Sequence, residues 1–146
     1  MSESDRETET VFVTDSDARS RTLCAGLLLL TVATGLASRR FPAWQPELVS
    51  RYAGDTLWAA MVFWGLALLG PRAKTLALSG GAIAIAWAVE LSQLYRAPWL
   101  DAVRATRMGA LALGQGFLWS DLACDVLGVC MAAIADHALR REIIES

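Results

Sequence analysis

The sequence predicts an all-α membrane protein: a four-helix transmembrane bundle with a short interfacial amphipathic helix between spans 3 and 4. Of the 146 residues, 55% are hydrophobic, and the mean hydropathy is +0.40. The apolar residues form long blocks with almost no charge, which a soluble domain of this size does not show. No block carries a polar stripe wide enough to face water, and this disfavours the alternative, a soluble all-α bundle with a very apolar core.

Four apolar blocks are long enough to cross a bilayer. A hydrocarbon core of about 30 Å takes about 20 helical residues, and roughly 17 suffice. The blocks are residues 22–38, 52–71, 75–95 and 116–135. Six acids and few apolar residues in the first 20 positions predict a disordered tail. The predicted domains are therefore an acidic tail (1–20), a four-span membrane domain (21–136) and a charged C-terminal tail (137–146).

Four spans place both tails on one side of the membrane. We call this side A, and it also holds the turn at residues 71–74. The opposite side, side B, holds two longer segments, residues 39–51 and 96–115. Basic residues flank the spans equally on both sides, so the positive-inside rule does not orient the protein. Because an acidic tail need not be translocated, we expect side A to be cytoplasmic and the membrane to be the plasma membrane.

The segment APWLDAVRATR, residues 97–107, predicts the short interfacial helix. Its proline stands where a first helical turn tolerates it. One face of this helix carries Trp99, Leu100 and Val103, and the other carries mostly Asp101, Arg104 and Arg107. The apolar, glycine-broken run MGALALGQG follows, and it either dips into the membrane edge or packs over the bundle.

Side B gathers the polar residues that interrupt the spans. Asp55 starts span 2, Glu90 and Gln93 end span 3, and Asp121 and Asp125 start span 4. Because successive spans run in opposite directions, all five lie toward side B. Intramembrane acids usually face the bundle interior and pair with a cation or a ligand. The aromatic residues expected on the same side are Trp44, Trp58, Trp87, Trp99, Trp119, Tyr52 and Tyr95.

We expect the polar pair of span 3, Glu90 and Gln93, to lie against the aspartates of span 4. Gly128 continues the face of those aspartates, so it should let spans 3 and 4 approach closely. Acids gathered in a low dielectric repel one another, so at least one should be neutralised or paired with a cation. The arginines of the 96–115 segment, Arg104 and Arg107, are the expected counter-charges. The alternative is that they reach lipid phosphates instead.

Several function classes lack their motifs. His137 is the only histidine and lies in the C-terminal tail, so no histidine-based catalytic or metal motif can form. The sequence has no glycine-rich phosphate loop, and its basic residues do not cluster as they would in a nucleic-acid site. We therefore expect no cofactor, no metal and no nucleic-acid partner.

Two function classes remain. In the first, a polar site rimmed by aromatic residues on one membrane face binds a lipid or amphiphile headgroup, with arginines meeting a phosphate. Its expected ligand-binding residues are Glu90, Gln93, Asp121, Asp125, Asp55, Arg104, Arg107 and Trp119. In the second, a membrane-embedded enzyme or proton-coupled transporter uses Glu90 with Asp121 and Asp125. Membrane lipid is the expected partner, and a homo-oligomer or a membrane-protein partner stays open.

Two motifs carry a resemblance to known families. The segments ELSQLY and DLACDVLGV resemble the Glu-x-x-Gln and Asp-to-Gly motifs of VanZ-like small bacterial membrane proteins. More closely, GDTLWA, ELSQL and RATRMGALALGQGFLWSDLACDVLG resemble an uncharacterised family of small bacterial membrane proteins known only as a domain of unknown function. The resemblance implies a membrane-helix fold and places Glu90, Gln93, Asp121 and Gly128 on the shared motif. It implies no reaction.

The first prediction is that reporter fusions at the two ends of the chain will report the same side of the membrane. An even number of spans returns the chain to the side on which it started. Fusions of a reporter active only in the cytoplasm and one active only outside it measure this directly. Opposite locations for the two ends would show that one apolar block does not cross.

Overall fold

The computed structural model describes residues 18–40, 46–113 and 117–145, and within them the chain is helical with no strand. The helices are α2 (Arg21–Arg40), α3 (Glu47–Leu69), α4 (Thr75–Ser92), α5 (Pro98–Arg104), α6 (Arg107–Leu113) and α7 (Trp119–Glu145). Four of these helices, α2, α3, α4 and α7, are long and apolar enough to cross a membrane. The predicted four-helix bundle is therefore confirmed.

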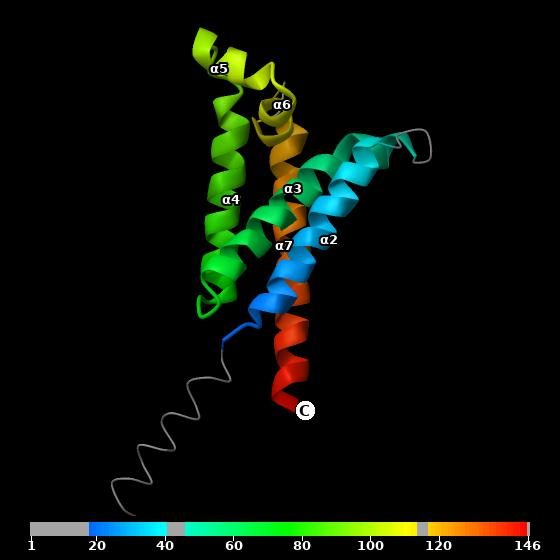
Figure 1. The fold of residues 1–146 in the computed structure, drawn as a ribbon, viewed down its shortest axis with the longest axis vertical. Helices are drawn as coiled ribbons and strands as arrows, with labels where there is room; N and C mark the ends of the chain where they lie inside the picture. Colours follow the sequence, from blue (N-terminus) through cyan, green and yellow to red (C-terminus); the bar gives the residue numbers. More distant parts are fainter. Residues whose placement is uncertain (1–17, 41–45, 114–116, 146) are drawn as a thin grey trace, which may run out of the picture.

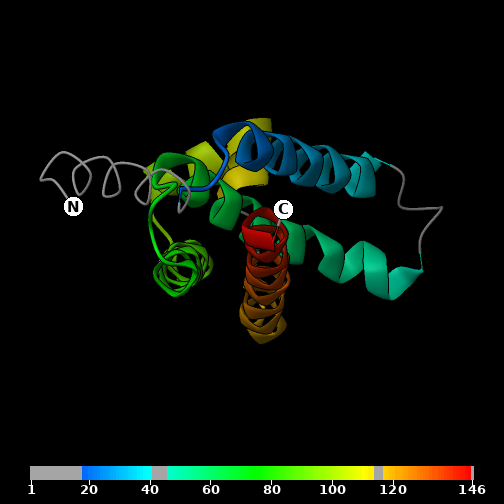
Figure 2. The same cartoon turned by 90° about the horizontal axis from the view of Figure 1, so that it is seen from below.

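Helix α3 is the central element of the bundle. It packs against α2, α4 and α7, and α7 also packs against α4. Helices α4 and α7 run side by side, while α2 and α3 form a second pair that is inclined to them (Figures 1 and 2). The first turn of α2, the turn between α3 and α4, and the last turns of α7 lie toward one end, which is side A (Figure 1). Helices α5 and α6 lie at the other end, which is side B.

Small residues fill the contacts between the helices. Alanines of α3, α4 and α7 are buried where these helices meet: Ala59, Ala67, Ala82, Ala86 and Ala132. Small side chains let transmembrane helices approach closely, because packing and not the hydrophobic effect holds helices together in lipid. Large apolar side chains such as Leu29, Leu69 and Ile134 are exposed on the outer faces, where lipid chains would surround them.

Helix α7 approaches α3 very closely at Gly128. A Cβ atom added to Gly128 would lie 2.0 Å from the backbone oxygen of Thr56, so only glycine fits there. We expected Gly128 to let span 4 approach span 3, which is α4. The helix that Gly128 approaches is instead α3, so this expectation is wrong. The reason is the position of α3 in the bundle, between α2, α4 and α7.

A buried arginine joins three segments at side A. Arg19 lies within the range predicted as the acidic tail, just before α2, and its Nε and Nη2 donate to the carboxylate of Asp136 on α7 at 2.5 and 2.7 Å. Its guanidinium also donates to the carbonyl oxygen of Ala73 at 2.5 Å and to the hydroxyl of Thr75 at 2.9 Å. The Thr75 hydroxyl in turn donates to Asp136 at 2.6 Å. We call this set of contacts the Arg19 clasp.

Some predicted elements differ from the observed ones. Helix α7 continues to Glu145, through the range predicted as a C-terminal tail. The predicted interfacial helix is present as α5, with Pro98 in its first turn, and the apolar run after it forms the second short helix α6. Helix α6 packs on α5 and α4, so the described part of this run, residues 108–113, lies over the bundle. Residues 1–17 of the predicted acidic tail lie outside the described residues, as does Trp44.

The second prediction is that Gly128→Ala destabilises the fold. The added methyl group meets the Thr56 backbone, and such overpacking costs about 1–3 kcal/mol. A helical glycine replaced by alanine in open space should instead gain up to about 1 kcal/mol. Gly80→Ala in α4 is the matched control, because nothing lies within 4 Å of its new Cβ. Thermal unfolding in detergent compares the two variants, and equal stability would contradict the close contact.

Candidate functional site

Four acids from three helices gather at side B. Asp55 lies in the third turn of α3, Glu90 in the last turn of α4, and Asp121 and Asp125 in the first two turns of α7. Glu90, Asp121 and Asp125 are buried, and Asp55 is half-buried. The charges of Asp125, Asp55 and Asp121 all act on Glu90, so the four carboxyls form one electrostatic group. We call them, together with Gln93, the acid cluster.

The two polar residues of α4 are bonded to each other. The amide nitrogen Nε2 of Gln93 donates to Oε2 of Glu90 at 2.8 Å, across one turn of the helix. Both residues are buried, and Gln93 is only 7% exposed. The other end of the amide, Oε1 of Gln93, is buried and has no hydrogen-bond partner. This arrangement leaves an acceptor available at the site.

The two aspartates of α7 differ in their hydrogen bonding. Asp121 accepts hydrogen bonds from the backbone nitrogen of Leu118 at 3.0 Å and from the hydroxyl of Ser120 at 3.3 Å, as acids at a helix start commonly do. Asp125 is 0% exposed, and neither of its carboxylate oxygens has a hydrogen-bond partner. A buried acceptor without a donor costs about 1–3 kcal/mol, so Asp125 works against the stability of the fold. Buried groups kept at such a cost are expected at functional sites.

The expectation that Arg104 supplies the counter-charge is wrong. Arg104 is buried, but its Nη2 donates to the carbonyl oxygen of Ser92 at 2.5 Å and its Nη1 to that of Tyr95 at 3.2 Å. Its Nη1 also pairs with Asp101 at 3.3 Å. Ser92 is the last residue of α4, where the negative end of the helix dipole lies, and its carbonyl oxygen accepts from the guanidinium as well as from the backbone nitrogen of Tyr95.

Arg107 and Trp119 lie apart from these contacts. Arg107 is exposed at the first residue of α6, and Trp119 is 76% exposed at the first residue of α7. Among the described side chains, no arginine or lysine forms an ion pair with Glu90, Asp121 or Asp125. Arg107 is therefore available to a ligand at the membrane surface rather than bonded to the acids.

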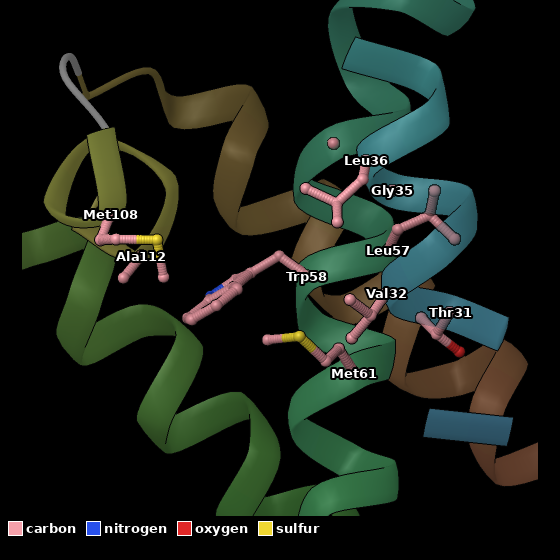
Figure 3. A pocket seen from close by; sticks show the side chains of 10 residues that line it. Thr31, Val32, Gly35, Leu36, Leu57, Trp58, Met61, Met108 and Ala112 are labelled. Carbon is pink, nitrogen blue, oxygen red and sulfur yellow. The ribbon is translucent and has the colours of Figure 1, made fainter. Parts of the chain in front are cut away.

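An apolar cavity lies between α2, α3 and α6. It has a volume of about 330 Å³ and is lined by residues that include Val32, Trp58 and Met108. Figure 3 shows the Trp58 side chain extending from α3 toward Met108 and Ala112 of α6, with Val32 and Leu36 of α2 on the opposite side. The indole Nε1 of Trp58 is buried and has no hydrogen-bond partner.

The cavity and the acid cluster share one turn of α3. Gly54 and Trp58 line the cavity, and Asp55 lies between them in the helix. The side chains of the acid cluster do not line the cavity, so the two sites share a level of α3 and not a wall. The sequence alone did not predict the cavity, because its lining residues are ordinary apolar positions of three separate segments.

Sequence reasoning also missed the Arg19 clasp. Asp136 was placed at the end of the membrane domain and given no role, yet it is buried and bonded. A usable signal was present, since Asp136 interrupts an otherwise uncharged stretch of α7 and therefore needs a partner. The identity of that partner could not be predicted, because Arg19 lies 117 residues earlier in the chain.

One family model matches the chain. The family described as "Protein of unknown function (DUF2809)" matches residues 44–129. This range contains α3 to α6 and the first turns of α7, and so the whole acid cluster, whereas the two charged residues of the Arg19 clasp, Arg19 and Asp136, fall outside it. No solved structure matches the chain.

The third prediction is that Glu90→Gln stabilises the protein. The variant removes one of the crowded acids but keeps an oxygen that accepts the Gln93 hydrogen bond, so stability should rise by on the order of 1 kcal/mol. Thermal unfolding of delipidated protein in detergent at neutral pH measures the change. Asp101→Asn is the control, because Asp101 is half-exposed and pairs with Arg104, and its loss should cost at most about 1 kcal/mol. A Glu90→Gln variant less stable than the parent would mean that a cation already balances the cluster.

Proposed function

Given that the chain belongs to the DUF2809 family of proteins of unknown function, we propose that it is an integral membrane protein that binds a lipid or similar amphiphile. The chain of the amphiphile occupies the apolar cavity, and its headgroup lies at side B beside the acid cluster. The observation that carries this proposal is the cavity itself, an apolar space of about 330 Å³ whose lining includes Trp58, with a buried indole nitrogen that lacks a partner.

The size and lining of the cavity suit an apolar chain. Small-molecule pockets commonly measure about 300–1,000 Å³, and they combine apolar walls with a few polar groups that fix orientation. Here the walls are aliphatic and aromatic, and the buried indole nitrogen of Trp58 is a polar group of the lining that has no hydrogen-bond partner. The cavity is formed by three helices, two of which are long enough to cross the membrane, so lipid is the most abundant apolar molecule near it.

The surroundings of the cavity suit a headgroup at side B. Arg107 is exposed and directly precedes Met108, which lines the cavity, so it can meet a phosphate as a charge-assisted pair. Trp99 and Trp119 are exposed at the starts of α5 and α7. Tryptophan prefers the interface between lipid and water, and this supports a headgroup level at side B.

Three further proposals follow from the sequence. The membrane is the plasma membrane of a bacterium, with side A cytoplasmic. A relation to VanZ-like proteins is supported by Glu90 and Gln93 on α4 and by Asp121 and Gly128 on α7, which stand in the order of that motif. Exposed apolar faces leave room for a second copy or another membrane protein beside the bundle.

The fourth prediction is that Val32→Phe lowers the amount of lipid that stays bound after purification. The larger side chain fills part of the cavity, so an acyl chain fits less well. Native mass spectrometry of the protein in detergent counts the retained lipid, and we expect a fall of about fivefold, close to 1 kcal/mol of binding free energy.

The matched control for this experiment is Ala33→Phe. Ala33 is the next residue of α2, but it is exposed and does not line the cavity. The control should retain lipid as the parent does. Equal retention by the parent, Val32→Phe and Ala33→Phe would place any bound lipid outside the cavity and defeat the proposed function.

A further inference from the structure

The acid cluster contains buried acceptors and few donors. Within the acid cluster, the buried atoms without a partner are Oε1 of Gln93 and both carboxylate oxygens of Asp125, and with Asp125 ionised all three are acceptors. Two buried donors without a partner, Nε of Arg104 and Nε1 of Trp58, belong to residues outside the cluster. The amide nitrogen of Gln93 is a donor within the cluster, and it is already used by Glu90. What the site lacks is therefore a group that donates several hydrogen bonds at once.

The missing group also carries positive charge. Glu90, Asp121 and Asp125 are buried together, and no described arginine or lysine forms an ion pair with them. A cation among these acids gains from each of their charges, in a place where water does not weaken the attraction. Gln93 adds an uncharged acceptor to the same site, and it is independent of the acids.

A bare metal ion does not match the geometry. Among the described residues, no group of three or more carboxylates, cysteines or histidines lies close enough to hold one metal ion. An ammonium group is larger than a metal ion and binds through directed N–H bonds, so it tolerates acceptors that are further apart. A primary ammonium has three N–H donors, as many as the buried acceptors that lack partners.

We propose that the acid cluster binds the primary ammonium group of a zwitterionic lipid headgroup, between Glu90, Gln93 and Asp125. This inference rests on the proposed function, because the chain of the same lipid occupies the neighbouring cavity. The two sites lie at the same level of α3, where Gly54 and Trp58 line the cavity and Asp55 lies between them along the helix. The buried indole nitrogen of Trp58 is a donor, and it suits an ester or phosphate oxygen between the ammonium and the chain.

The fifth prediction tests this lipid specificity. Delipidated protein in detergent is mixed with equal amounts of three lipids with identical chains: a phosphatidylethanolamine, its N-acetylated form and a phosphatidylcholine. The first has the primary ammonium, the second has no charge on nitrogen, and the third has the charge without N–H donors. Native mass spectrometry should show the first retained about tenfold over each of the others, close to 1.4 kcal/mol of binding free energy, because it alone combines a positive charge with N–H donors.

Two variants locate the preference within the protein. Asp125→Asn removes the charge of the buried carboxylate, so retention of the three lipids should become equal to within about twofold, since the cavity still binds their chains. Asp101→Asn removes a half-exposed acid that pairs with Arg104 and Arg96, so it should keep the preference of the parent. A preference that survives Asp125→Asn would overturn the assignment to this cluster.

The outcomes separate this inference from the proposed function. Equal retention of all three lipids by the parent overturns the ammonium inference and leaves the amphiphile-binding function standing. Retention of none of them overturns both. Ethylammonium in water tests whether the amine comes from a lipid. At the concentration of the lipid it should not displace the phosphatidylethanolamine, and displacement would assign the site to a soluble amine instead.

Discussion

The contact between Gly128 and the Thr56 backbone sets the depth at which α7 lies against α3. Asp125 is three residues before Gly128, and Asp55 is the residue before Thr56, so this single contact brings acids from two helices to the same level. Helix α4 packs on both α3 and α7 and adds Glu90 and Gln93 there. A side chain larger than hydrogen at position 128 would separate the helices and open the acid cluster. The polar site therefore depends on a packing constraint that carries no charge.

The buried charged groups at the two ends of the bundle differ in their hydrogen bonding. At side A, the guanidinium of Arg19 and the carboxylate of Asp136 bond to each other and to the turn between α3 and α4, so the charges at this end are paired. At side B, Asp125 and the Oε1 atom of Gln93 have no donor. A buried pair with full hydrogen bonding holds elements in place, whereas buried acceptors without partners lower stability. This contrast is why we assign structure to side A and binding to side B.

Much of the fold was predictable because membrane helices need long apolar blocks, and acids that interrupt such blocks stand out. Glu90, Gln93 and Asp125 were identified as a cluster on that ground, and the structure brings them together. The direction of Arg104 was not predictable, since helical periodicity gives the face of a residue but not what lies beside that face. For the same reason, the sequence does not show which helix Gly128 approaches. The cavity was not predictable either, because it forms only where three separate helices pack together.

The Arg19 clasp has a consequence for how the protein is made. Arg19 leaves the ribosome long before Asp136, which is 117 residues further along the chain, and chains begin to fold while synthesis continues. Until α7 has entered the membrane, the guanidinium lacks the Asp136 carboxylate and stays in water or among headgroups. The first span is therefore inserted before the ion pair can form. Because α7 is synthesised last, its insertion supplies the contact that fixes the start of α2 to the bundle.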